Sequence, residues 1–192
     1  WDALTTAALA RGFDLKFLET TGLTIVKEDK KYDRFRGRVM FPIHNLTGRT
    51  LGFGGRTLKS DKKVPKYVNS PESDIYHKSD VLYGMYQAKQ AVRMQDNCYL
   101  VEGYLDVLSL YQGGIQNVVA SSGTSLTEGQ IKLIARYTQN ITVLYDGEEG
   151  NIPDTMIDAQ MRVLNHAYDG PLDRLLRHDA ERDTYWLDLA RP

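Results

Sequence analysis

The residues of this chain best suited to chemistry are carboxylates that directly follow short apolar segments. One group follows residues 98–101, and a second group follows residues 141–145. Carboxylates at the ends of buried strands can converge on one divalent cation, because hard cations such as Mg²⁺ take carboxylate oxygens as ligands. The candidate metal ligands are Glu102, Asp106, Asp146 and Glu148.

The segments around these carboxylates alternate between strand and helix patterns. Short apolar runs closed by glycine or serine indicate strands, and the longer segments between them have apolar side chains at helical spacing. The predicted strands and helices are, in order, residues 98–101, 104–112, 117–120, 127–137 and 141–145. This alternation predicts a parallel sheet, in which ligands bind beyond the carboxyl ends of the strands. Glu102 and Asp146 both fall at such ends.

Each acidic motif also has an ordinary structural interpretation. Glutamate and aspartate at strand ends often cap helices or form turns, and Asp146-Gly147 alone is a common turn signal. The two motifs together favour a metal site, because each follows an apolar strand and includes a glycine that lets the backbone approach a ligand. A sparse acidic cluster suits phosphoryl transfer better than a structural metal site.

The basic side chains are concentrated in the first half of the chain. Residues 1–97 carry 17 Lys and Arg against 11 Asp and Glu, whereas residues 98–192 carry 7 against 14. Between Lys27 and Lys66 there are 12 basic and 4 acidic side chains, interleaved with aromatic residues. A nucleic-acid polymerase needs this combination, since cations hold phosphates while carboxylates hold metals. A solvated surface is the alternative, and we prefer it for the lysines of loop 58–63.

Individual cations in this segment have the spacing of binding residues. Arg34, Arg36 and Arg38 occupy alternate positions, so on a strand they would share one face and form a phosphate-binding ridge. An exposed charged strand face is the alternative. Arg56 and Lys66 adjoin glycines and an Asn-Ser-Pro turn, and we expect both on loops that can approach a nucleic-acid backbone.

Several ordered motifs resemble the catalytic core of bacterial DnaG-type primases. Glu102-Gly-Tyr-Leu-Asp106-Val with Asp146-Gly-Glu148 is similar to the Toprim signature of primases, type IA and II topoisomerases and some nucleases. The motifs that narrow the resemblance to primases are Tyr32-Asp-Arg-Phe-Arg-Gly-Arg-Val-Met-Phe-Pro-Ile, Gly48-Arg-Thr-Leu-Gly-Phe-Gly-Gly-Arg56, Lys66-Tyr-Val-Asn-Ser-Pro-Glu72, Leu82-Tyr-Gly84 and Ser121-Ser-Gly-Thr-Ser-Leu-Thr127. The resemblance covers about residues 1–147.

The resemblance implies a DNA-directed RNA polymerase that makes short RNA primers on single-stranded DNA from ribonucleoside triphosphates. It implies Mg²⁺ or Mn²⁺ held by Glu102, Asp106, Asp146 and Glu148, of which Glu102, Asp146 and Glu148 are catalytic. The positions matching residues that hold template or nucleotide are Arg34, Arg56, Lys66 and Lys78. Tyr67 and Asn69 could line the same pocket, or be a packed aromatic and a turn-forming asparagine.

The chain departs from the family pattern after Asp146. Primases usually continue as Asp-Gly-Asp followed shortly by Ala-Gly, whereas this chain has Asp146-Gly-Glu-Glu-Gly-Asn151 and no later Asp-Gly-Glu-Asp-Pro-Asp-like motif. Primases usually have aspartate where this chain has Glu148, and the glutamate moves the charge outward by one methylene. Small displacements of reacting groups are costly, so this difference bears on metal positioning.

The expected fold is α/β: a Toprim-like parallel sheet flanked by helices, preceded by an α+β subdomain with short, mostly antiparallel strands and followed by a helical tail. The expected subdomains are residues 1–95, 96–150 and 151–192. The further expected elements are helices at 2–10, 14–20 and 84–94, strands at 23–26, 38–43 and 50–58, a turn at 45–48, and tail helices at 154–166 and 171–189.

Other site classes have little support. Cys98 is the only cysteine and reads as a core residue, and the histidines lack metal-ligand spacing, so no zinc is expected. No Gly-x-x-x-x-Gly-Lys-Ser/Thr loop and no bilayer-length apolar run are present. The resemblance implies a cytoplasmic place at the bacterial replisome. It also implies a zinc-binding module and a helicase-binding region outside this chain, with the helicase and single-strand-binding protein as partners through such regions.

Two other functions remain open on the residues alone. A Toprim-type nuclease would keep the metal site but cut DNA. A module that grips single-stranded nucleic acid without catalysis would need only the basic segment. A topoisomerase has less support, because no tyrosine can be assigned as a DNA-linked nucleophile.

Overall fold

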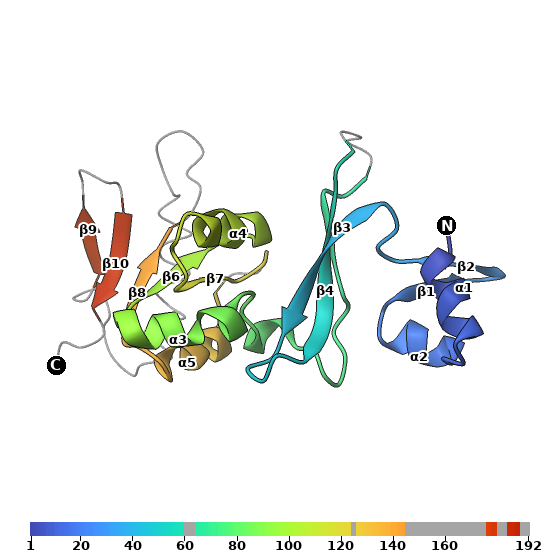
Figure 1. Cartoon of the computed structure of the whole chain (residues 1–192), viewed down its shortest axis with the longest axis horizontal. Coiled ribbons are helices and arrows are strands. Elements are labelled where there is room, and N and C mark those ends of the chain that lie inside the picture. Colours follow the sequence, from blue (N-terminus) through green and yellow to red (C-terminus); the bar gives the residue numbers. More distant parts are fainter. Residues whose placement is uncertain (60–63, 124–125, 145–175, 180–183, 189–192) are drawn as a thin grey trace. The chain divides into compact units, whose positions relative to one another are not determined.

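The computed structural model describes residues 1–59, 64–123 and 126–144, and the backbone of residues 176–179 and 184–188 (Figure 1). The described residues fall into two compact units. Unit 1 comprises residues 1–43 and 50–77, and unit 2 comprises the described parts of residues 44–49 and 78–192. Within these described ranges, no helix has the length and apolar character needed to cross a bilayer.

Unit 1 begins with two short helices packed on an antiparallel hairpin. These elements are α1 (Ala3–Ala10), α2 (Leu15–Thr20), β1 (Thr24–Lys27) and β2 (Lys30–Asp33). The Asp14 carboxylate accepts the N–H of Lys16 and caps α2, which explains where that helix begins. Both predicted helices and the first predicted strand are confirmed. Strand β2 was not predicted, because it is largely charged and is specified by pairing with β1 rather than by apolar alternation.

The rest of unit 1 is a sheet with the strand order β3-β4-β5. Its strands are β3 (Arg38–His44), β4 (Thr50–Thr57) and β5 (Tyr67–Asn69). The predicted turn between β3 and β4 is confirmed, since the Asn45 side-chain oxygen accepts the N–H groups of Thr47 and Arg49 at 3.0 and 2.9 Å. Gly55 allows close packing, because a Cβ there would lie 2.7 Å from the Phe35 ring.

Unit 2 contains the predicted parallel sheet. Strands β7, β6 and β8 lie side by side, with Val101 paired to Ala120 and Leu100 paired to Val143, both in parallel register. The elements of this unit are η1 (Lys78–Asp80), α3 (Met85–Gln95), β6 (Cys98–Val101), α4 (Tyr104–Gln112), β7 (Val118–Ala120), α5 (Glu128–Ala135) and β8 (Asn140–Val143). The predicted strand and helix alternation is confirmed.

Helices cover both faces of this sheet (Figure 1). Buried residues of α3 and α5, including Val92 and Ile131, form one cluster with Leu100, whereas Val107 of α4 joins a second cluster with Val118. Cys98 lies fully buried in the first cluster, as expected for a core cysteine, and burial raises the pKa of its thiol to about 12. The α/β architecture, with antiparallel strands before the parallel sheet, is therefore confirmed.

The helix predicted over residues 171–189 is wrong. The structure instead has β9 (Leu176–Asp179) and β10 (Thr184–Asp188), which pair with each other, and β10 pairs antiparallel with β8. The sheet order becomes β7-β6-β8-β10-β9. Pairing with β10 satisfies the backbone edge of β8, and threonine and aromatic residues in residues 184–186 favour a strand. The helix predicted at 154–166 lies outside the described residues.

Candidate metal site and nucleic-acid interface

The carboxyl edge of the parallel sheet brings Glu102 next to the segments that follow β7 and β8. The Glu102 carbonyl accepts the N–H of Ser122 at 3.0 Å, and the N–H of Leu144 donates to the Leu100 carbonyl at 2.8 Å. The Glu102 side chain is exposed at this edge. Asp146 and Glu148 follow Leu144 in the sequence and lie outside the described residues.

Asp106 has a structural bond at the start of α4. One carboxylate oxygen accepts the N–H of Gly103 at 2.9 Å, so Asp106 caps the helix that follows Glu102. Among the residues that the structure describes, no three His, Cys, Asp or Glu side chains lie close enough together to hold a metal ion.

Lys78 lies in η1, which packs against the N-terminus of α5. Helix α5 follows β7 in the chain and therefore begins at the carboxyl edge of the sheet. Glu102 ends its strand at this same edge. The topology of unit 2 thus places the backbone of Lys78 on the side of the sheet that carries Glu102.

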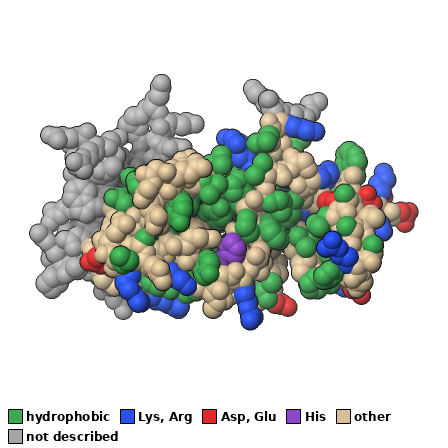
Figure 2. Space-filling model, in the orientation of Figure 1, with side chains coloured by type: hydrophobic (Ala, Val, Ile, Leu, Met, Phe, Trp, Pro, Cys, Tyr) green, Lys and Arg blue, Asp and Glu red, His purple; other side chains and the backbone are tan. Residues whose placement is uncertain are grey.

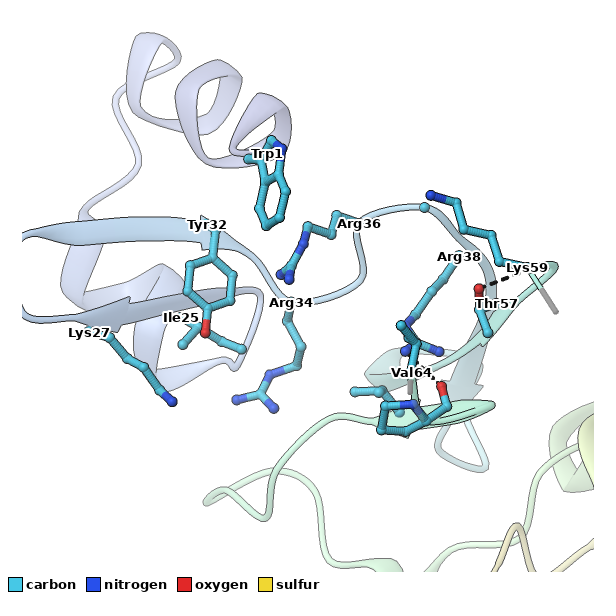
Figure 3. Close-up of a pocket in the computed structure, with 13 residues that line it drawn as sticks. Trp1, Ile25, Lys27, Tyr32, Arg34, Arg36, Arg38, Thr57, Lys59 and Val64 are labelled. Carbon is cyan, nitrogen blue, oxygen red and sulfur yellow. Dashed lines mark hydrogen bonds between the residues drawn. The ribbon is translucent and has the colours of Figure 1, made fainter. Parts of the chain in front are cut away.

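Unit 1 contains a groove of about 950 Å³ between its hairpin and its sheet (Figure 3). Its lining includes five cationic side chains: Lys27, Arg34, Arg36, Arg38 and Lys59. Figure 2 shows that most acidic side chains visible on this face lie on the right, over α1, α2, β1 and β2 (Figure 1), whereas the basic side chains are spread more widely. Because the described residues that line the groove include these five cations and no Asp or Glu, the groove offers a locally positive surface.

Arg36 lies between two aromatic rings. Its guanidinium carbon is 4.6 Å from the ring centroid of Trp1 and 4.6 Å from that of Tyr32 (Figure 3). Both contacts are within cation–π range and hold an otherwise exposed side chain in place. Sequence reasoning missed Trp1 and Lys27 as groove residues, because the contacts that place them there join segments distant in the sequence.

The predicted strand face of Arg34, Arg36 and Arg38 is wrong, although all three line the groove. Residues 34–37 form a turn with Gly37 at φ +65°, and only Arg38 belongs to β3. A left-handed glycine breaks the alternation that a continuous strand would need.

Two of these arginines are fixed by backbone carbonyls. Arg34 donates from Nε to the Gly22 carbonyl at 2.6 Å. Arg38 donates to the carbonyls of Gly55, Pro65 and Lys66 at 3.2, 2.8 and 3.1 Å. The pKa of Arg38 is lowered, mainly because the guanidinium is partly buried and secondly because of the nearby positive charge of Arg36. Arg38 thus joins β4 to the segment before β5.

Arg56 lies on β4, within the predicted strand 50–58 and not on the loop also expected for it, and Tyr67 lies on β5. They pair across β4 and β5, and the Arg56 guanidinium lies 5.9 Å from the Tyr67 ring centroid. Arg56 Nε is buried and finds no hydrogen-bond acceptor among the described residues. Arg38 packs against Gly55 on one face of the sheet. Because successive residues of a strand point to opposite faces, Arg56 lies on the other face.

Asn69 and Lys66, the other predicted binding residues of this segment, lie in β5 and directly before it. Asn69 pairs with Gly54 within β5 and β4, so the turn interpretation of Asn69 is replaced by a strand position. Lys66 precedes β5 with an exposed side chain, and its carbonyl accepts the N–H of Thr57 at 3.0 Å. Because Thr57 and Val68 line the groove, strand alternation places Arg56 and Tyr67 on the opposite face of the β3-β4-β5 sheet.

Two family models match consecutive parts of the chain. Residues 1–89 match the N-terminal domain of the DNA primase catalytic core, and residues 99–152 match a Toprim-like model. The chain is 45% identical over 163 residues to a DNA primase of Halalkalibacterium halodurans, covering 84% of this chain and 27% of that protein. It is 51% identical over 140 residues to the DNA primase of Escherichia coli K12, covering 73% and 23%.

Solved primase structures share the fold. The Aquifex aeolicus primase, with its zinc-binding and RNA polymerase domains, superposes with a TM-score of 0.76 at 36% identity, covering 86% of this chain and 40% of that one. A DnaG primase catalytic domain bound to single-stranded DNA gives a TM-score of 0.68 at 42% identity, covering 88% and 50%. The chain spans about a quarter of the length of these curated relatives.

Proposed function

The chain belongs to the DnaG-type primases as part of their catalytic core, and on this premise we propose that it synthesises short RNA primers on single-stranded DNA from ribonucleoside triphosphates. The observation that carries the proposal is the order of two matches in one chain, a primase N-terminal core followed by a Toprim-like domain with Glu102 exposed at its sheet edge. Its place of action is the bacterial cytoplasm. The replicative helicase and the single-strand-binding protein are predicted partners through regions outside this chain.

We propose that Glu102, Asp146 and Glu148, with Asp106, hold Mg²⁺ or Mn²⁺. The donor set fits this assignment, because all four are carboxylates and Glu102 is exposed at the edge where parallel sheets bind ligands. When bound, the metal supplies charge stabilisation for the transferring phosphate and the leaving pyrophosphate. The hydrogen bond from the Ser122 N–H to the Glu102 carbonyl helps to fix the backbone that carries the Glu102 side chain. Asp106 caps α4, the helix that follows Glu102 in the chain.

We propose two further roles for the cations. Lys78, at the same sheet edge as Glu102, contacts the incoming nucleotide's phosphates. Arg56, Tyr67 and Asn69, on strands β4 and β5, and the exposed Lys66 before β5 provide nucleotide or template contacts. The groove set, Arg34, Arg36 and Arg38, holds the template backbone. Support comes from charge, since cations in a groove bind phosphates and gain from counterion release.

Primer synthesis on single-stranded DNA with labelled ribonucleotides and Mg²⁺ or Mn²⁺ tests the proposal. Glu102→Gln keeps the size of the side chain but removes its charge, so it should abolish RNA synthesis while leaving DNA binding within about twofold. Glu19→Gln, an exposed position on α2, is the matched control and should retain activity.

Three outcomes would overturn the primase proposal or its metal assignment. Full synthesis by Glu102→Gln refutes the metal role of Glu102. Metal-dependent cutting of DNA with no RNA made would establish the nuclease alternative. Metal-independent DNA binding with neither reaction would establish a binding module.

A further inference from the structure

We propose that Gln130 is a positioning residue that fixes the backbone of Lys78 for nucleotide binding. The inference rests on the proposed role of Lys78 and names the residue through which the fold controls it. Gln130 lies on α5, far from Lys78 in the sequence, and does not itself contact the nucleotide in this proposal.

The Gln130 side chain is fully buried and hydrogen-bonded at both ends. Its Nε2 donates to the carbonyls of Lys78 and Val81, each at 3.0 Å, and its Oε1 accepts the N–H of Thr127 at 3.2 Å. Both amide protons and the carbonyl oxygen are therefore used. A buried polar side chain is stable only when it is satisfied in this way.

Two neighbours of Gln130 restrain the same η1 turn. The Thr127 hydroxyl donates to the Ser79 carbonyl and accepts the N–H of Gln130. Gly129 packs so closely that a Cβ would lie 2.5 Å from Asp80 Oδ1 and 2.8 Å from the Ser79 carbonyl. The start of α5 thus contacts the carbonyls of Lys78, Ser79 and Val81 and the carboxylate of Asp80, and leaves this turn little room to shift.

The chemistry of Gln130 explains why an apolar residue would not serve. Methionine would fill nearly the same space but would leave the Lys78 and Val81 carbonyls without their donors. Unpaired buried carbonyls cost free energy, so the η1 turn would move to find other partners. Because one of these carbonyls belongs to Lys78, the backbone that carries its side chain would move, and its ammonium would approach a phosphate less favourably.

The same connection reaches the metal edge. The segment between β7 and α5 gives the Ser122 N–H to the Glu102 carbonyl, and α5 then holds Lys78. One chain segment therefore sets the backbone of both a proposed metal ligand and a proposed phosphate ligand. Loss of Gln130 should affect nucleotide binding more than the stability of the sheet.

The test measures binding of ATP with Mg²⁺ to the 192-residue chain by titration calorimetry. Lys78→Ala should weaken binding about tenfold or more, the scale of one lost charge-assisted hydrogen bond. Gln130→Met should weaken it about three- to tenfold, and the double variant should be no weaker than Lys78→Ala alone, because both act through one group. Gln139→Met, exposed and bonded only to the nearby Ala135 carbonyl within the described chain, is the control and should match the wild type.

Each result separates this inference from the proposed function. If Lys78→Ala binds ATP normally, the role of Lys78 fails and the inference fails with it. If Lys78→Ala is weak while Gln130→Met binds normally, or if their losses add, the inference alone is overturned. If Gln130→Met does not fold by circular dichroism, Gly129→Ala decides, since it keeps every Gln130 bonding group but displaces η1, and normal ATP binding by that variant overturns the inference.

Discussion

Replacing Asp33 with asparagine tests how unit 1 holds the start of α1 and, with it, Trp1 above the groove. Asp33 is 8% exposed, and its carboxylate accepts the N–H of Leu4 at 2.8 Å, the N–H of Thr5 at 2.9 Å and the Thr5 hydroxyl at 2.7 Å. Its own N–H donates to the Trp1 carbonyl at 2.9 Å. One side chain thus ties α1 to β2.

The magnitude follows from these bonds. A hydrogen bond to a charged group contributes about 1.5–3 kcal/mol to stability. Asparagine keeps one acceptor oxygen but turns an NH₂ donor toward groups that are themselves donors, so at least one bond is lost and the charge assistance disappears. We expect Asp33→Asn to lower the free energy of unfolding by about 2–4 kcal/mol.

The lowered pKa of Asp33 determines how the free energy of unfolding should change with pH. Burial alone would raise the pKa of Asp33, but the hydrogen bonds from Thr5 and Leu4 outweigh it and the pKa is lowered. A lowered pKa in the folded state stabilises the protein above the unfolded pKa of about 3.9, and that stabilisation is lost as the pH falls below it. Asp33→Asn should therefore lose less stability between pH 5 and 3 than the wild type, these pH values being roughly one unit either side of that pKa.

Urea unfolding at several pH values, with native-state hydrogen exchange at the amides of Leu4 and Thr5, measures this effect. Asp29→Asn, exposed in the turn of the hairpin, is the matched control and should change the free energy of unfolding by less than about 0.5 kcal/mol. An Asp33→Asn protein with control-like stability, unchanged exchange and the wild-type pH profile would refute the reasoning.

Three further predictions concern the groove, the core and the cysteine. Arg36→Ala should reduce the slope of log affinity for single-stranded DNA against log salt by about 0.7, and an unchanged slope would exclude a phosphate contact by Arg36. Ile131→Ala should cost about 2–5 kcal/mol in urea unfolding, because Ile131 is fully buried, while the exposed Lys132→Ala should be near neutral; equal effects would contradict the packing. Cys98, with its thiol pKa raised to about 12, should resist alkylation in the native protein at about pH 8 and react once urea unfolds it; rapid native labelling would contradict its burial.

The parallel unit could be predicted because its signals are local. Apolar strands such as residues 98–101 are buried from both sides, so their composition alone marks them, and the helices between them carry their own spacing. Strand β5 and the tail strands lacked such signals. Their backbone groups are satisfied by neighbouring strands, so a local pattern is not enough to identify them.

The candidate site likewise has some features that local sequence patterns predict and others that depend on tertiary contacts. Glu102 could be placed at a strand end from the sequence, as could the cationic character of residues 27–66. The pairing of Arg56 with Tyr67 and the anchoring of Arg38 on three carbonyls could not be predicted, because both require the segment around residues 65–67 to lie against β4.

The sequence by itself determined the alternation of strands and helices from β6 to β8, the position of Glu102 after β6, and the concentration of positive charge before residue 67. These follow from side-chain periodicity and composition, which act over a few residues. Only the tertiary structure decided that Arg36 lies between Trp1 and Tyr32 and that Gln130 holds Lys78. The contacts of Arg36 with Trp1 and of Gln130 with Lys78 join residues distant in the chain, and they form only after the hydrophobic cores have brought the segments together.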